Sequence, residues 1–228
     1  MKTRIIASVL FLIAANSFAQ QNHRKYFPLG LFHKPNAEIT GISVGLFSGM
    51  NDKQVNTTTN GLRLEFVGLG VLFPLVPKSP LSENDSLIAN SGVEFTEKIN
   101  GINISGTGTI CADCIVNGIT IGTVSQYLYA SNGATISLLM TVIDRQNGVQ
   151  LSAFNESHLL KGVQVGVSNY SLFVNGLQVG VIGNYARKIH GIQIGFFNKT
   201  ANLKGMQVGI WNINQKRKMP FINWNFNQ

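Results

Sequence analysis

A short glycine-centred phrase recurs at an almost constant interval along the chain, and this regularity restricts the possible folds more than any other feature. Gly176-Leu-Gln-Val-Gly180 returns as Gly191-Ile-Gln-Ile-Gly195. Looser copies of the phrase begin at Gly41, Gly61 and Gly101. A fixed period over so many units is the signature of a repeat architecture. The regular units are separated by steps of 15, 15, 14, 14, 15 and 14 residues and begin at Gly118, Gly133, Gly148, Gly162, Gly176, Gly191 and Gly205.

Each unit has the pattern of a β-strand. In the segment 177–181, Leu, Val and Val alternate with Gln and Gly, which predicts a half-buried strand. A second, shorter apolar cluster precedes each glycine, so that two short strands and two turns fill one unit. An asparagine recurs where a turn is expected, and asparagine tolerates a left-handed backbone there. These asparagines are Asn155, Asn169, Asn184, Asn198 and Asn212.

Parallel stacking of such units predicts an all-β fold, a repetitive β-solenoid with coils of about 14–15 residues, in which each coil contacts only its neighbours. Equivalent glutamines would then stand about 4.8 Å apart and bond to one another as a ladder. The alternation defines two faces of the strand but leaves open whether the ladder faces the interior or the solvent. The glutamines of this predicted ladder are Gln150, Gln164, Gln178, Gln193 and Gln207.

Two other all-β folds are compatible with the alternation. An outer-membrane β-barrel also has strands whose residues alternate between a lipid face and a lumen face. Its neighbouring strands run antiparallel, however, so identical units would not place identical residues side by side. A β-sandwich is the third alternative. The uniform spacing after Gly118 favours the solenoid.

The chain begins with a predicted signal peptide, residues 1–19. Lys2 and Arg4 precede an apolar run, and Ser17-Phe18-Ala19 fits the pattern that signal peptidase cleaves. We therefore expect export to the cell envelope, whether to the outer membrane, the cell surface or the periplasm. The other segments are an N-terminal segment (20–40), irregular β repeats (41–117) with a proline-rich insertion near 68–94, the regular repeats (118–212) and a C-terminal cap (213–228).

Charge is distributed unevenly along the chain. Residues 20–156 contain eight basic and ten acidic residues, whereas residues 157–228 contain eight basic and no acidic ones. This asymmetry predicts a cationic end that binds an anionic glycan, lipopolysaccharide or lipid surface, with nucleic acid disfavoured by the expected export. The alternative is a solvated cationic surface without a ligand. The candidate basic face consists of Lys161, Arg187, Lys188, Lys199, Lys204, Lys216, Arg217 and Lys218.

Cys111 and Cys114 are the only cysteines. Their flanks are strand-like and no helix follows, which disfavours a redox motif of the type that places a thiol at a helix N-terminus. A zinc site would need two further ligands, and His158 and His190 have no suitable spacing. We expect a local disulfide in an oxidising compartment, and no metal.

Residue patterns typical of catalysis are scarce. There is no Gly-x-Ser-x-Gly elbow and no phosphate-binding loop. Glu94 and Glu97 have the spacing of an acid–base pair, but such a pair is common by chance. We therefore expect no cofactor and no catalytic residue.

The units Gly-x-Gln-x-Gly-x-x-Asn, with the last at 205–212 and the ending Pro220-Phe-Ile-Asn-Trp224, resemble exported bacterial surface-repeat proteins. The resemblance covers roughly residues 118–224 and implies a location in the cell envelope without known catalytic residues. The leading hypothesis is a non-enzymatic structural or binding protein of the envelope. The alternatives are a small outer-membrane barrel that acts as a pore, and an enzyme that acts on acidic polysaccharides.

Overall fold

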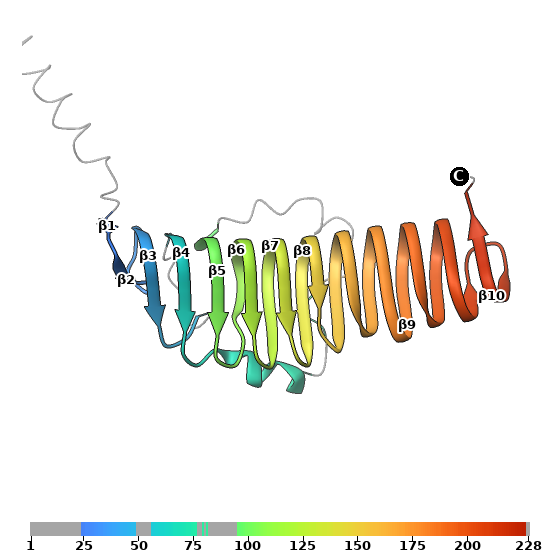
Figure 1. Cartoon of the computed structure of the whole chain (residues 1–228), viewed down its shortest axis with the longest axis horizontal. Coiled ribbons are helices and arrows are strands. Elements are labelled where there is room, and N and C mark those ends of the chain that lie inside the picture. The colour runs from blue at the N-terminus through green and yellow to red at the C-terminus, as the bar shows by residue number, and fades with distance from the viewer. Residues whose placement is uncertain (1–23, 49–55, 77–78, 80, 82–94, 227–228) are drawn as a thin grey trace, which may run out of the picture.

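The structure, a computed structural model, describes residues 24–48, 56–76, 79, 81 and 95–226, so the predicted signal peptide lies outside the described residues. It is an elongated stack of β coils (Figure 1). The strands are β1 (Arg24–Tyr26), β2 (Leu29–Leu31), β3 (Ala37–Gly45), β4 (Thr57–Glu65), β5 (Glu97–Ser105), β6 (Ile110–Gly122), β7 (Ser125–Ser137), β8 (Met140–Leu151), β9 (Phe154–Ile213) and β10 (Lys218–Asn225). Two short 3-10 helices are η1 (Leu69–Val71) and η2 (Phe73–Leu75).

Neighbouring coils pair in parallel and in register. Gly41 pairs with Gly61, and the alignment continues glycine on glycine as far as Gly148 with Gly162. β9 then winds without interruption through the regular C-terminal repeats (Figure 1). The fold is therefore the predicted β-solenoid. The barrel alternative and the sandwich alternative are both wrong, since each coil lies in parallel on the preceding one with equivalent repeat positions matched.

The glycine that opens each coil is required by backbone geometry. Gly176 has a φ of +147°, and a Cβ added there would lie 1.9 Å from the carbonyl oxygen of Gly162 in the coil before it. The same geometry recurs along the column. The asparagines behave differently from the prediction, because the only described non-glycine residues with positive φ are Asn36, Asn56 and Phe221. The prediction that the repeat asparagines adopt a left-handed backbone is therefore wrong.

The glutamine ladder faces the interior. All five glutamines are fully buried, and Gln164 Nε2 donates to Gln150 Oε1 at 2.8 Å. The same 2.8 Å bond repeats at each step as far as Gln207. The aliphatic residues on either side of each glutamine point outward, as Ile192 and Ile194 do with 37% and 42% of their surface exposed. The polar side chains of this strand therefore line the core, and its apolar side chains face solvent.

A second ladder lies inside the turn that follows each glutamine strand. Asn155 Nδ2 donates to Asn169 Oδ1 at 2.8 Å and to the backbone oxygen of Val165 at 2.8 Å. Equivalent bonds continue through Asn184 and Asn198 to Asn212. These asparagines hold one coil to the next by side-chain bonds, which explains their fixed offset. Their amides donate toward the C-terminus, whereas the glutamine amides donate toward the N-terminus.

The opposite wall of the solenoid supplies the apolar part of the core. Two clusters of buried side chains line it along the stack. Apolar groups here offset the cost of ordering the chain, while the ladders satisfy every amide that they bury. The clusters contain Ile99, Cys111, Cys114, Val116, Leu128 and Ile143 in the first, and Leu160, Val174, Ala186, Ile189 and Leu203 in the second.

The C-terminal strand closes the stack. β10 pairs antiparallel with the last coil of β9, with a register shift between Met219 and Phe221. Asn223 Nδ2 donates to Gln207 Oε1 at 3.3 Å and so continues the ladder by one member. Arg217 Nε in turn donates to Asn223 Oδ1 at 2.9 Å. Pro220 and three neighbouring cations lie on this outermost strand or its turn, a composition that discourages pairing with another strand.

Two single substitutions, one at the buried Gln178 and one at its neighbour Leu177, test which side of the strand faces the core. Gln178→Leu should lower the free energy of unfolding by about 2–4 kcal/mol, because Gln193 Nε2 loses its acceptor inside the core. Leu177→Gln, the matched control on the outer side, should cost less than about 1 kcal/mol. Urea unfolding monitored by circular dichroism measures both variants. The reverse order of stability would show that the ladder faces solvent.

Candidate functional site: a basic groove on the C-terminal coils

A groove with a volume of about 460 Å³ lies over the C-terminal coils. It is on the outer side of the wall opposite the glutamine strands. Its lysines are Lys161, Lys188 and Lys204. Lys161 and Lys204 directly precede a coil glycine, and Lys188 stands three residues before one. The parallel stack therefore brings together cations that are far apart in sequence. The complete lining is Leu159, Leu160, Lys161, Phe173, Val174, Asn175, Lys188, Ile189, His190, Asn202 and Lys204.

The groove combines charge, amides and an aromatic surface. The Lys188 ammonium lies 5.9 Å from the centre of the Phe173 ring. Asn175 and Asn202 are exposed and add amide donors and acceptors beside the lysines. Among the residues that the structure describes, no carboxylate forms an ion pair with the three lysines. The arrangement offers three ammonium groups to an external anion.

An aromatic stack stands beside the groove on the same wall. Tyr170 and Tyr185 lie parallel with ring centres 5.0 Å apart, as expected for equivalent residues of successive coils. The Lys199 ammonium lies 5.8 Å from the Tyr185 ring centre. Arg187 is half-buried on the strand that leads into the groove. Both basic residues thus belong to the wall that carries the groove without lining it.

The basic residues of the cap lie outside the groove. Lys216 and Lys218 are exposed in and after the turn that precedes β10. Arg217 holds the end of the glutamine ladder, donates through Nη2 to the Trp224 carbonyl oxygen at 2.9 Å and lies 4.4 Å from the Trp224 ring centre. The structure therefore divides the predicted basic face into a groove, its flank and a cap, and gives Arg217 a structural role.

The surface position just before the coil glycine changes character along the stack. In the N-terminal coils it holds an outer ladder in which Asn100 donates to Asn60, Asn117 to Asn100, Asn132 to Asn117 and Asn147 to Asn132, at 2.7–2.8 Å. In the C-terminal coils the same position holds Lys161, Asn175, His190 and Lys204. The repeat alignment shows that these residues occupy equivalent positions, but it does not identify a groove. The first cation at this position is Lys161, which precedes the fourth regular unit.

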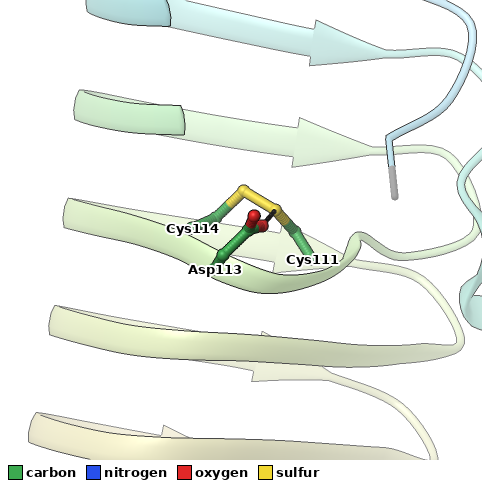
Figure 2. Close-up of side chains that lie close together, drawn as sticks. All are labelled: Cys111, Asp113 and Cys114. Carbon is green, nitrogen blue, oxygen red and sulfur yellow. Dashed lines mark hydrogen bonds between the residues drawn. A yellow bond between two sulfur atoms is a disulfide. The ribbon is translucent and has the colours of Figure 1, made fainter. Parts of the chain in front are cut away.

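The two cysteines form a disulfide within one coil (Figure 2). Cys114 is fully buried and Cys111 nearly so, and the strand register shifts between Cys111 and Ile115. Asp113 lies against the disulfide, with its Oδ1 3.2 Å from the Cys111 sulfur. Asp113 and the two sulfurs lie within 4.8 Å of one another, but the bonded sulfurs are not the thiolates that bind a metal.

An Asp–His pair lies in the coils just before the groove. Asp144 Oδ1 is hydrogen-bonded to His158 Nδ1, and the buried His158 Nε2 has no partner among the described residues. No serine, threonine or cysteine of the described part accepts or donates a bond at Nε2, as a nucleophile activated by this histidine would. Burial raises the pKa of the nearby Tyr127 phenol, and the negative charges of Asp144 and Asp113 add to that effect.

Glu94 and Glu97, which have the spacing of an acid–base pair, are not seen to form one among the described residues. Glu97 is bound by the fully buried Arg63, with Nε to Oε1 at 2.6 Å and Nη2 to Oε2 at 3.1 Å. Glu65 accepts from the Ser48 hydroxyl at 2.7 Å in the same cluster. Glu94 lies outside the described residues. Glu97 therefore serves a buried ion pair between coils.

Comparisons with known proteins add no family: no protein-family model matches the chain, and no curated protein or solved structure does either. The described residues include no helix with the length and apolarity needed to span a membrane.

Loss of the disulfide should reduce stability modestly. The double variant Cys111→Ala/Cys114→Ala opens a short loop, and the chain-entropy relation gives a loss of about 2 kcal/mol. Urea unfolding of the variant and of the oxidised wild type measures the difference. Equal midpoints for the two proteins would contradict a stabilising crosslink. Treatment with a reductant should lower the wild-type midpoint and leave that of the variant unchanged.

Proposed function

We propose that this chain is a non-enzymatic protein of the bacterial cell envelope that binds an extended, negatively charged sugar chain. The observation that supports the proposal most strongly is the groove in which Lys161, Lys188 and Lys204 stand among amides and an aromatic ring. An acidic glycan and the sugar portion of lipopolysaccharide share the chemistry that such a groove recognises: anionic groups, hydroxyls and the apolar faces of the rings.

The repeat geometry suits a polymeric ligand. Coils succeed one another at about 4.8 Å, so a polymer laid along the stack meets a similar surface at each step. Lys161 and Lys204 are three coils apart, which gives a span of about 14 Å. The groove volume also lies within the range of about 300–1,000 Å³ that is usual for ligand sites. Several sugar residues would therefore contact the site together.

Two features of the chain support a location in the envelope. The N-terminal residues have the pattern of a signal peptide, and the cysteines form a disulfide of the kind typical of oxidising compartments. The resemblance to exported surface-repeat proteins points to the same place.

Binding fits the groove better than hydrolysis does. Glycoside hydrolases use a pair of carboxyl groups on either side of the scissile bond. The groove lining contains three lysines and a histidine but no aspartate or glutamate. Incubation with acidic polysaccharides should therefore leave their length unchanged, and the appearance of new chain ends would contradict a purely binding role.

Removing the groove cations should weaken binding selectively. The triple variant Lys161→Gln/Lys188→Gln/Lys204→Gln loses three charges, two exposed and one half-buried, each worth about 0.5 kcal/mol against an anion. The expected loss of affinity for polygalacturonate is about tenfold, measured by isothermal titration calorimetry. A neutral dextran should bind neither protein appreciably.

A matched control removes the same charge elsewhere. Lys25→Gln/Lys34→Gln/Lys98→Gln alters the N-terminal coils, where the groove is absent, and should bind polygalacturonate as the wild type does. Equal weakening by both triple variants would show that net charge, rather than the groove, governs binding. Purified lipopolysaccharide in place of polygalacturonate distinguishes the two sources of the anionic sugar.

A further inference from the structure

The outer side of the glutamine strands forms a continuous apolar surface, which we call the apolar face. It consists of the residues one and three positions after each coil glycine, together with the corner residues five and six positions after it. The residues at these positions in the described coils include no charged side chain. Examples are Ile102 and Ile104, Ile119 and Ile121, Val149 and Leu151, and Ile192 and Ile194, each 37–42% exposed.

The face extends over the whole stack. β2 places Leu29 beside Ile42 and Leu31 beside Val44 at one end. At the other end, β10 places Trp224 beside Met206 and Ile222 beside Val208. About eleven strand spacings of about 4.8 Å give a length of about 50 Å, and five residues along the strand give a width of about 16 Å.

The corner residues are the most exposed part of the face. Val181 and Phe196 expose 63% and 54% of their surface, and Leu138 exposes 73%. In two coils the corner position holds Gly106 or Thr123 in place of a large apolar residue. The η1–η2 segment packs against the chain near this corner. Among the described residues, the chain therefore covers this corner where it is not apolar, and the apolar corner residues are left exposed.

The area of the face is about 800 Å², whereas the largest apolar patch of a typical monomer is roughly 300–600 Å². An apolar surface of this size marks an interaction site. A stable protein interface buries about 800 Å² on each partner, which is the area that this face offers. The flat, uncharged sheet surface is also complementary to itself, as required of the shared patch in a two-fold dimer.

We propose that two copies of this chain pair through their apolar faces, with the glutamine strands packed sheet on sheet. A two-fold axis perpendicular to the solenoid axis lays the N-terminal coils of one copy on the C-terminal coils of the other. The charge asymmetry supports this direction. Residues 20–156 contain eight basic and ten acidic residues, a net charge of −2, whereas residues 157–228 contain eight basic and no acidic residues, a net charge of +8. An antiparallel pair places these opposite charges next to each other. The basic grooves then face outward on opposite sides.

A lipid bilayer is the less suitable occupant. The groove lysines lie on the wall opposite the apolar face, so they would point away from anionic headgroups if the face entered a membrane. Arg217 stacks on Trp224 at one end of the face, and the other residues of the face that the structure describes include no cation to anchor it. A membrane-surface protein usually combines apolar burial with basic residues on its rim.

Sedimentation equilibrium of the purified wild type tests the pairing. The expected mass is twice that of one chain at micromolar concentration. The variant Ile121→Glu/Val165→Glu/Ile194→Glu places charges on the face at least two coils apart and should be monomeric, with a dissociation constant raised at least a hundredfold. The control Thr58→Glu/Asn147→Glu/Ala201→Glu adds the same charge off the face and should remain dimeric.

Circular dichroism checks that the variants keep their coils. Should the glutamates unfold the chain, the neutral variant Ile121→Thr/Val165→Thr/Ile194→Thr replaces them with the same expected loss of pairing. A monomeric wild type would overturn the proposal, as would a face variant that still dimerises. Flotation of monomeric wild type with phosphatidylcholine vesicles, lost in the face variant, would replace the second copy with lipid as the occupant.

Discussion

The buried amide ladder is the interaction on which the rest of the structure depends. Gln178, for example, donates to Gln164 in the preceding coil and accepts from Gln193 in the following coil, so a buried polar group is satisfied only where the coils are in register. A buried amide without its partner costs about 1–3 kcal/mol, and a shift of one coil by one residue would turn its glutamine outward and break the bonds to both neighbouring glutamines. Register is thus set by hydrogen bonds in the core, and the glycine column permits the close approach that these bonds require.

The ladder also determines the surface. Because glutamine occupies the inner side of its strand, alternation sends the flanking aliphatic residues outward, and one side of the solenoid becomes apolar. The other wall keeps its apolar residues inside and shows polar ones to solvent, including the groove lysines. The molecule consequently has two unlike faces, one chemically suited to an anionic ligand and the other to an apolar partner. The C-terminal cap continues both the ladder and the apolar face: Asn223 bonds to Gln207 in the core, and Trp224 lies beside Met206 on the face.

The sequence predicted the solenoid and the alignment of the glutamines, because both follow from a period that can be counted. It did not predict which side of the strand faces inward, since alternation is the same from either side. The asparagines were expected to have a left-handed backbone, because asparagine tolerates one in a turn, and only the coil geometry shows that they form a ladder inside the turn instead. Arg63 and Glu97 are 34 residues apart, and no repeated pattern in the sequence indicates that they form a pair. The groove likewise depends on how Phe173 and Lys188 meet across coils.

Hydrogen exchange of the glutamine side-chain amides tests the inward-facing ladder most directly. In wild-type protein labelled with ¹⁵N-glutamine, the NH₂ protons of Gln164, Gln178, Gln193 and Gln207 should persist in D₂O for hours, because each donates to a buried acceptor. Free ¹⁵N-glutamine in the same buffer provides the reference, with exchange complete within the first spectrum, because the exposed Gln215 itself donates to the Leu203 carbonyl oxygen at 3.2 Å. Exchange of the ladder amides as fast as that of free glutamine would contradict a polar core and would place the glutamines on the surface.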